Sequence, residues 1–239
     1  MPALDGQGII VTGAAQGLGA AIAGRFAAEG ARLAVMDHDG PGLEATARAC
    51  GETCLSISAD LSDKQQTDAA IATAFAYLGR IDTVVHNAAI LVPRPFEAED
   101  FTSFRRTVDV GLQAGFQLAH AAWPLMRQQG DGTVVFVSSR SGIEGFANEA
   151  AYCAAKHALE GVAKSLAQEG APFGIGVFTV TPGMYMRTPM SERNYSDDLK
   201  QKWVDPMLLT TAFVRLAQRD PQLPQSGRLD AWELSGRGN

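Results

Sequence analysis

The amino-acid sequence predicts an α/β fold, in which a doubly wound parallel sheet carries helices on both faces. Short apolar runs alternate along the chain with longer Ala-rich stretches in which apolar residues recur at helical spacing. The runs lack strict polar alternation, as is typical of strands that are buried on both faces. Because crossovers between parallel strands are right-handed, this alternation leads to a doubly wound sheet.

The expected strands cover residues 8–12, 32–36, 53–58, 83–86, 133–138, 176–180 and, more weakly, 228–234. The expected helices cover residues 17–29, 43–50, 63–78, 100–129, 150–168 and 205–219. We find no repeat and no linker, so we expect one domain over residues 1–239. A polar, Met-rich segment at about 183–205 follows the sixth strand, where it predicts either a substrate lid or a surface loop without a role.

Composition excludes several classes of function. The net charge of -6 and the absence of a Lys/Arg cluster argue against a nucleic-acid partner. No apolar stretch reaches membrane-spanning length and no signal peptide is recognisable, so we expect a cytoplasmic protein with no membrane partner. Cys50, Cys54 and Cys153 are expected to be free thiols, since no second cysteine pair or nearby histidine supports a metal site.

The first strand leads into a glycine-rich turn that opens a helix. The turn reads Thr12-Gly13-Ala14-Ala15-Gln16-Gly17-Leu18-Gly19. Glycines permit a tight turn and a close backbone approach to a pyrophosphate, whose charge the free N–H groups of the helix then stabilise. A glycine triplet alone is a weak signal, but this strand–turn–helix context predicts a dinucleotide site with Gly13, Gln16, Gly17, Leu18 and Gly19 around the phosphates.

The residues after the second and third strands indicate which dinucleotide binds. Asp37 can accept both ribose hydroxyls of the adenosine, and it would repel a 2′-phosphate. No Arg or Lys stands at positions 14–16 or 38–39 to neutralise such a phosphate. The sequence therefore favours NAD over NADP, although Asp37 could be an ordinary helix-capping residue. Asp60 and Leu61 could contact the adenine, and Asp60 could equally be the N-cap of the next helix.

Tyr152 and Lys156 lie four positions apart, hence on one face of a helix. Hydride transfer at a carbonyl carbon needs a proton transfer at its oxygen, and a phenol becomes a useful base only beside a positive charge. Lys156 and an oxidised nicotinamide ring can supply that charge. The pair alone is common, so its weight depends on the surrounding motifs.

In five motifs the chain resembles the classical short-chain dehydrogenase/reductase family, from about residue 6 to residue 234. The motifs are the glycine turn, His86-Asn87-Ala88-Ala89, Ser139, the pair Tyr152 and Lys156, and Pro182-Gly183. The resemblance implies a Rossmann-type, three-layer fold with strand order 3-2-1-4-5-6-7. It also implies a homo-oligomer, a dimer or a tetramer, formed through the two long helices.

The resemblance also implies a role for each motif. Ser139 would hydrogen-bond the substrate oxygen, Tyr152 would be the acid/base, and Lys156 would bind the nicotinamide ribose while assisting Tyr152. Asn87 and Ala88 would border the cofactor. The nicotinamide carboxamide would be bordered by Pro182, Gly183 and Thr188.

Three departures from the family pattern stand out. Gly111 replaces an Asn of the long helix before the fifth strand, which in the family helps to hold a water in a proton relay from the Lys. Ala89 replaces a Gly near the cofactor, and one extra residue separates Gly183 from Thr188. The last change predicts a reshaped lid.

The substrate pocket is expected to mix apolar and polar side chains, as small-molecule sites usually do. Its expected lining is Leu91, Val92, Arg94, Ser141, Ile143, Glu144, Phe146, Asn148, Met184, Tyr185 and Met186. Arg94, Arg140 or Arg187 could pair with a substrate carboxylate. The preferred hypothesis is an NAD-dependent dehydrogenase of a secondary, small cyclic or aromatic alcohol. The alternative is a dinucleotide-binding regulatory or scaffold protein, which only Gly111 supports.

Overall fold

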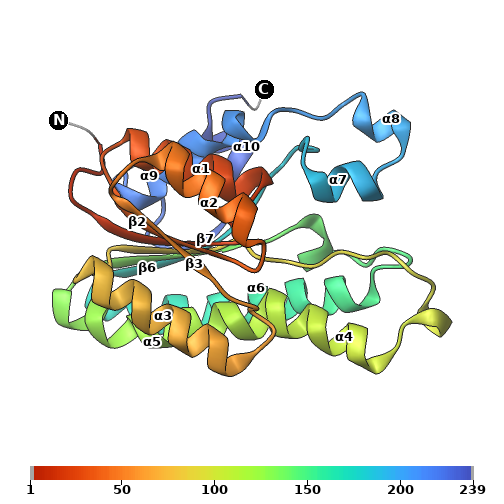
Figure 1. The fold of residues 1–239 in the computed structure, drawn as a ribbon, viewed down its shortest axis with the longest axis horizontal. Coiled ribbons are helices and arrows are strands. Elements are labelled where there is room, and N and C mark those ends of the chain that lie inside the picture. Colours follow the sequence, from red (N-terminus) through yellow and green to blue (C-terminus); the bar gives the residue numbers. More distant parts are fainter. Residues whose placement is uncertain (1–2, 238–239) are drawn as a thin grey trace.

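The computed structural model describes residues 3–237 and contains a seven-stranded parallel sheet between two layers of helices (Figure 1). The strand order is β3-β2-β1-β4-β5-β6-β7, which confirms the predicted doubly wound topology. The chain crosses from one face to the other between β1 and β4, so the ends of these two strands lie side by side. No helix within the described residues is long and apolar enough to cross a membrane.

The strands are β1 Gly8–Thr12, β2 Arg32–Asp37, β3 Cys54–Ser58, β4 Thr83–His86, β5 Gly132–Val137, β6 Ile175–Thr181 and β7 Gly227–Asp230. The α-helices are α1 Gly17–Ala28, α2 Gly40–Cys50, α3 Lys64–Leu78, α4 Phe101–Val108, α5 Ala114–Gln129, α6 Ala150–Gly170, α7 Pro189–Asn194, α8 Asp197–Lys200, α9 Thr210–Ala217 and α10 Ala231–Leu234. Shorter helical turns are η1 Phe96–Ala98, η2 Asp109–Gln113, η3 Arg140–Gly142, η4 Ala171–Phe173 and η5 Pro206–Leu209.

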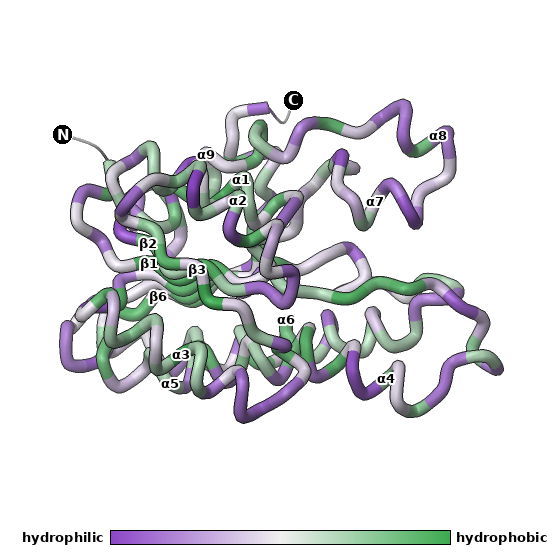
Figure 2. Tube along the Cα trace, viewed as in Figure 1, coloured by the Kyte–Doolittle hydropathy of each residue, from purple (hydrophilic) through white to green (hydrophobic). Residues whose placement is uncertain are grey.

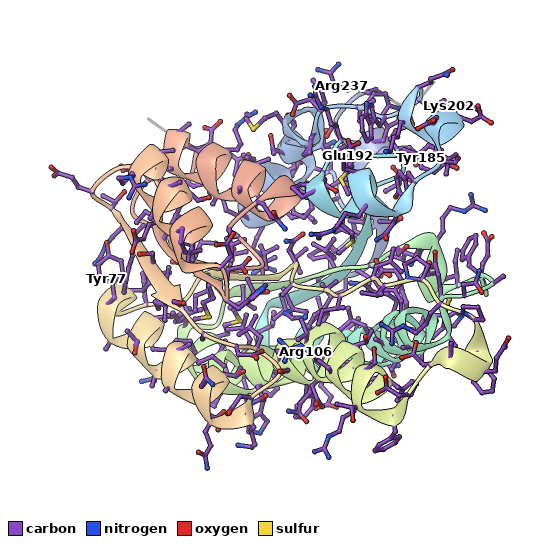
Figure 3. The ribbon with its side chains drawn as sticks, turned by 45° about the vertical axis from the view of Figure 1, so that its right-hand side comes forward. Tyr77, Arg106, Tyr185, Glu192, Lys202 and Arg237 are labelled. Carbon is purple, nitrogen blue, oxygen red and sulfur yellow. The ribbon has the colours of Figure 1, made fainter. Side chains whose placement is uncertain are left out.

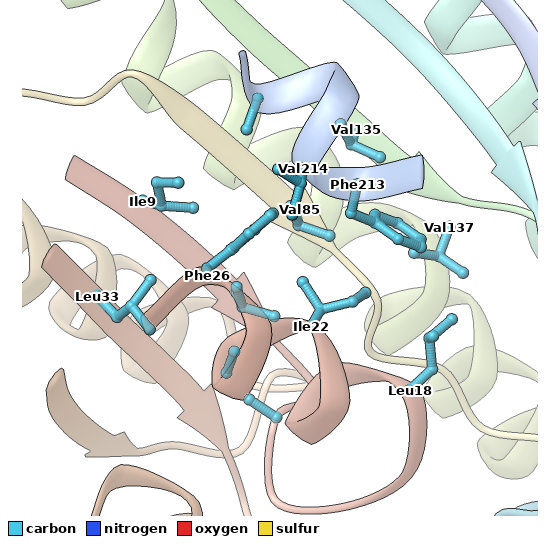
Figure 4. Close-up of a cluster of buried hydrophobic side chains, with 14 of the residues drawn as sticks. Ile9, Leu18, Ile22, Phe26, Leu33, Val85, Val135, Val137, Phe213 and Val214 are labelled. Carbon is cyan, nitrogen blue, oxygen red and sulfur yellow. The ribbon is translucent and has the colours of Figure 1, made fainter. Parts of the chain in front are cut away.

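The sheet has a hydrophobic core on each face. One core joins the sheet to α1, α2 and α9, and it contains Phe26 of α1, Phe213 of α9 and Val85 of β4 (Figure 4). The other core joins the opposite face to α3, α5 and α6. The strands are the most hydrophobic segments and lie between helices with polar outer faces (Figure 2). The strands therefore lack polar alternation for the expected reason, which is that both faces of the sheet are buried.

Three predicted elements differ from the structure. The helix expected at 205–219 consists of the 3-10 turn η5 and the shorter helix α9. The helix expected at 100–129 consists of α4, the π-helical turn η2 and α5, and Gly111 lies within η2. Glycine has a low helix propensity, and π-helical turns are commonly found near functional sites. The seventh strand, expected at 228–234, ends at Asp230, whose carboxylate accepts from the N–H groups of Trp232 and Glu233 and so begins α10.

The segment from Gly183 to Asp205 extends beyond the sheet and contains the short helices α7 and α8 (Figure 1). It follows β6 at the carboxyl edge of the sheet. Asn194 Nδ2 donates to the carbonyl of Leu91 at 2.9 Å, so α7 contacts the loop after β4. We call residues 183–205 the lid segment. Tyr185, Glu192 and Lys202 mark its course in Figure 3.

Candidate functional site

The glycine turn packs so tightly that side chains could not enter it. Gly13 has a φ of +66°, and a Cβ there would lie 2.7 Å from Ala88 Cα. A Cβ on Gly19 would lie 2.1 Å from the carbonyl oxygen of Gly13. These positions therefore require glycine, and the start of α1 lies close against the turn. A cradle of this kind leaves room for the close approach of a pyrophosphate.

The end of β4 supports the same turn through polar contacts. Asn87 Nδ2 donates to the carbonyl of Gly13 at 2.9 Å. The backbone N–H groups of Asn87 and Ala88 donate to Thr12 Oγ1 at 3.1 and 3.2 Å. The structure thus brings Asn87 and Ala88 to the glycine turn.

The first turn of α1 faces the lid segment. Gln16 is the N-cap of α1 and its side chain makes no capping bond, while Leu18 is buried in the core. A Cβ on Gly17, whose φ is +59°, would lie 3.2 Å from Thr188 Cβ. Thr188 therefore reaches the glycine turn despite the extra residue before it. Its Oγ1 accepts from the N–H of Ser191 and caps α7.

Asp37 ends β2 beside the glycine turn, with its carboxylate held in place by backbone groups. Oδ2 accepts from the N–H of Ala15 at 3.1 Å, and Oδ1 accepts from the N–H of Asp39 at 3.1 Å. Oδ2 therefore keeps a second lone pair that a ribose hydroxyl can use. His38 Nδ1 lies 3.0 Å from Oδ1, and its side chain is 73% exposed.

Asp60 and Leu61 follow β3 but have structural partners of their own. Asp60 pairs with Arg106 at 3.0 Å and accepts from Ser62, and Leu61 is buried in the core. The N-cap of α3 is Asp63, which accepts from the N–H groups of Gln65 and Gln66. The alternative in which Asp60 caps this helix is therefore wrong.

Tyr152 and Lys156 lie on one face of α6, below the end of β5. Lys156 is 1% exposed, and its Nζ donates to the carbonyl of Val137 at 2.6 Å and lies 5.6 Å from the centre of the Tyr152 ring. Burial lowers the pKa of Lys156 to about 8. Burial raises the pKa of Tyr152, and a hydrogen bond with Ser139 opposes this increase. Ser139, Tyr152 and Lys156 are thus brought together.

Gly111 lies in η2 against the same helix. A Cβ there would lie 3.3 Å from Ala155 Cβ, one residue before Lys156. The missing Asn side chain would therefore begin beside the candidate site. Pro182 and Gly183 follow β6, and Gly183 has a φ of +76° with Asp230 packed where a Cβ would lie.

Comparison with known proteins identifies the family. The sequence profile of the short chain dehydrogenases matches residues 7–199. The chain belongs to the short-chain dehydrogenase family. Levodione reductase from Leifsonia aquatica is 36% identical over 192 residues, which are 78% of this chain and 72% of that protein. A 2,5-dichloro-2,5-cyclohexadiene-1,4-diol dehydrogenase from Sphingobium indicum is 36% identical over 202 residues, 83% of this chain and 80% of that protein.

Solved structures agree with this assignment. A 3-ketoacyl-(acyl-carrier-protein) reductase from Brucella melitensis, complexed with NADH, has a TM-score of 0.87 at 26% identity and covers 95% of this chain and 96% of its own. A Beutenbergia cavernae protein described as an NAD(P)-dependent gluconate 5-dehydrogenase, with NADP bound at low occupancy, has a TM-score of 0.87 at 28% identity. The match covers 98% of this chain and 100% of that one.

In this short-chain dehydrogenase, two of the loops expected to line a substrate pocket are joined by a hydrogen bond. The N–H of Arg94 donates to the carbonyl of Asn148 at 2.9 Å and joins the loops after β4 and β5. Val92 and Ile143 are more than half exposed there. Two of the arginines are paired with carboxylates: Arg94 with Glu99 and Asp100, and Arg140 with Glu144. Arg187 is exposed.

The sequence reading missed two residues of this region, Glu149 and Tyr195. Glu149 accepts from Ser141 Oγ at 2.9 Å. Tyr195 of the lid segment packs edge-on against Tyr185, with ring centres 5.5 Å apart. The negative charge of Glu149 helps to raise the pKa of both Tyr152 and Tyr195. Glu149 directly precedes the helix that carries Tyr152, so its place near the site could have been predicted from the sequence. Tyr195 could not have been predicted in this way, because only the path of the lid segment brings it to this region.

Proposed function

We propose that the chain is an NAD-dependent dehydrogenase that interconverts a neutral secondary alcohol and its ketone, with Tyr152 as acid/base. The observation that carries the proposal is the grouping of Ser139, Tyr152 and Lys156 at the end of β5, next to the glycine turn. The alternative is a regulatory or scaffold protein without catalysis. The presence of all three side chains argues against it.

The residues around the turn fit a dinucleotide. Gly13, Gln16, Gly17, Leu18 and Gly19 would surround the pyrophosphate, because they form the turn that leads into α1 and the first backbone N–H groups of a helix favour a phosphate. Asp37 would accept one adenosine ribose hydroxyl at Oδ2, and the second at Oδ1 once the exposed His38 side chain moves away from it. The remaining contacts would come from Asp60, Leu61, Asn87, Ala88, Pro182, Gly183 and Thr188.

NAD is preferred to NADP for an electrostatic reason. Asp37 is 9% exposed, so a phosphate on the ribose would meet a poorly solvated carboxylate. Positions 14–16 and 38–39 hold no Arg or Lys that could neutralise it. One of the structural relatives was solved with NADH and another with NADP, so the preference depends on these residues of the chain itself.

The side chains divide the chemistry between them. A bound NAD would supply the hydride acceptor for oxidation of the carbinol carbon of the substrate. Ser139 donates a hydrogen bond to the substrate oxygen, and Tyr152 takes the hydroxyl proton. Because burial raises the pKa of Tyr152, the phenol needs positive charge nearby before it acts as a base. Lys156 supplies part of that charge and binds the nicotinamide ribose.

The substrate is proposed to be neutral, and small or cyclic. Arg94 and Arg140 are paired with carboxylates, and Glu149 would repel a substrate anion. The names of the two relatives refer to a levodione and to a cyclohexadiene diol. An alcohol of this kind would be held by the apolar side chains of Val92 and Ile143.

We also propose a homo-oligomer that is formed through α5 and α6. These helices lie together on one face of the sheet (Figure 1), and Phe116 of α5 is 48% exposed. Light scattering on the purified protein tests this proposal. A monomer at micromolar concentration would contradict it.

A coupled absorbance screen tests the proposed reaction. Cyclohexanol, cyclohexane-1,2-diol, cyclohexane-1,4-diol and the corresponding ketones are offered with NAD(H) and separately with NADP(H). We expect turnover with NAD(H) and at least about tenfold weaker turnover with NADP(H). Normal NAD binding without turnover of any substrate would overturn the dehydrogenase in favour of the scaffold protein.

A further inference from the structure

A buried carboxylate joins the last strand of the sheet to the helix that carries Tyr152. Arg228 of β7 pairs through Nη1 with Glu160 of α6. Two hydroxyl groups donate to the same carboxylate: Ser138 Oγ to Oε1, and Thr179 Oγ1 to Oε2 at 2.8 Å. Glu160 is only 4% exposed, so these donors replace the water that a carboxylate would otherwise bind.

The same arginine holds the backbone of Ser139. Arg228 Nη2 donates to the Ser139 carbonyl at 3.0 Å, and the N–H of Gly142 donates to that carbonyl at 3.1 Å. Nη1 also donates to Ser138 Oγ at 3.3 Å. The planar fork of a guanidinium fixes the direction of its hydrogen bonds. Through this fork, β7 helps to place the end of β5.

The turn η3 packs directly on the ion pair. A Cβ on Gly142 would lie 2.7 Å from Ser138 Oγ and 3.2 Å from Glu160 Cγ. Ser139 is the N-cap of this turn, and its Oγ accepts from the N–H of Ser141 at 3.1 Å. The place of the Ser139 hydroxyl therefore depends on a turn that the ion pair supports.

Glu160 connects these contacts to the other two side chains of the site. It follows Lys156 by four positions and Tyr152 by eight, so the three residues lie along one face of α6. The ion pair consequently links the strand end that carries Ser139 to the helix face that carries Tyr152 and Lys156.

We propose that Arg228 is a positioning residue for the reaction, which together with Glu160 sets the Ser139 hydroxyl against the substrate oxygen. This inference rests on the proposed function. Ser139 can hydrogen-bond the substrate oxygen only from the correct place, and a small misplacement of such a group is costly to the rate. Because the hydrogen bonds of Arg228 end on β5 and α6, the effect should fall on kcat and leave NAD binding unchanged.

Arg228→Lys tests the proposal, because lysine keeps the charge beside Glu160 but lacks the second arm that reaches the Ser139 carbonyl. With the best alcohol of the screen, kcat should fall about tenfold. The affinity for NAD, measured by calorimetry, should change less than about twofold.

Arg215→Lys is the matched control. Arg215 also donates to a carboxylate and to a backbone carbonyl, those of Asp220 and Leu234. Its side chain is 27% exposed, against 26% for Arg228. This variant should keep the wild-type kcat, since its partners lie outside the candidate site.

The same substitution in a Ser139→Ala protein separates positioning from a general effect on the fold. If Arg228 acts through the Ser139 hydroxyl, Arg228→Lys should lower kcat less than about twofold once that hydroxyl is absent. Glu160→Gln, which keeps an acceptor for Ser138, should show the same dependence on Ser139 and serves if Arg228→Lys does not fold.

Two results would overturn this inference and leave the proposed function in place. One is an equal loss of kcat in the presence and absence of the Ser139 hydroxyl, and the other is a wild-type kcat in Arg228→Lys. A wild type that turns over none of the alcohols or ketones would overturn the proposed function, and this inference with it.

Discussion

The glycine turn and the lid segment contact one another at Gly17 and Thr188, and they are built in different ways. The turn is held by close backbone contacts, such as Gly19 against the Gly13 carbonyl, and by buried polar groups such as Thr12. The lid segment is held mainly by side chains, including the Tyr185–Tyr195 contact and the partly exposed ion pair of Lys200 with Glu192.

This difference indicates which part of the site is fixed and which can vary. A backbone contact of under 3 Å excludes nearly every residue except glycine, so the turn constrains the sequence strongly. Side-chain contacts on a surface segment tolerate many residue types. Substitutions at the turn should therefore have large effects, and substitutions in the lid should have small ones.

Apart from loss of the Tyr152 hydroxyl, the largest effect is expected from Lys156→Met, at the centre of the site. Loss of the ammonium should lower kcat by roughly 100-fold or more, because Tyr152 loses a nearby positive charge. The free energy of unfolding should increase in the same variant, although kcat falls. Burial lowers the pKa of Lys156 to about 8, below its ordinary value, so at pH 7 the folded protein carries a penalised charge.

Removal of that charge should stabilise the folded state at pH 7 by roughly 1–2 kcal/mol after the loss of the hydrogen bond to Val137. The advantage should shrink as the pH rises above about 8, where the amine of the wild type is already neutral when folded. Urea unfolding at pH 7 and pH 9.5 measures the difference. An advantage that grows with pH would contradict this explanation.

Gly19→Ala tests the tight packing of the turn. The new methyl group would lie 2.1 Å from the Gly13 carbonyl oxygen, so α1 must shift, and NAD should bind at least about tenfold more weakly. Gly24→Ala is the matched control in the same helix, because its methyl group would meet nothing within 4 Å. That variant should bind NAD normally and gain roughly 0.5–1 kcal/mol of stability. Equal affinities in the two variants would refute the argument from packing.

Asp37→Asn tests the preference for NAD. Removal of the charge should lower the ratio of kcat/KM for NAD over NADP by about tenfold, since the repulsion of a phosphate disappears. Asp39→Asn makes the same charge change two residues further along, and Asn still caps α2. A ratio that changes equally in both variants would mean that Asp37 has no specific role.

The smallest effect is expected from Glu192→Gln in the lid segment. It breaks the pair with Lys200, in which the Glu192 side chain is 60% exposed, and such pairs contribute roughly 0–1 kcal/mol. KM for the alcohol should rise less than about threefold while the affinity for NAD stays constant. A large loss of NAD affinity would show that the lid and the turn are not independent.

The same difference explains what could be predicted from the sequence. The strands and the parallel sheet follow from the apolar runs, whereas the strand order and the meeting of Ser139, Tyr152 and Lys156 follow from the resemblance to the family. Two features depend on which of several local hydrogen bonds form. These are the π-helical turn at Gly111, set by its backbone bonds, and the early end of β7 at Asp230, set by a capping bond. Glu149 and Tyr195 reach the site through loop paths, and periodicity carries no information about such paths.

The central claim is that Tyr152 transfers the proton in an NAD-dependent reaction, and Tyr152→Phe tests it most directly. NAD binding by calorimetry and turnover of the best alcohol are measured on the same preparation. We predict an unchanged NAD affinity and a kcat that is lower by about 10²–10⁴-fold. A Tyr152→Phe protein that binds NAD normally and keeps the wild-type kcat would contradict the account.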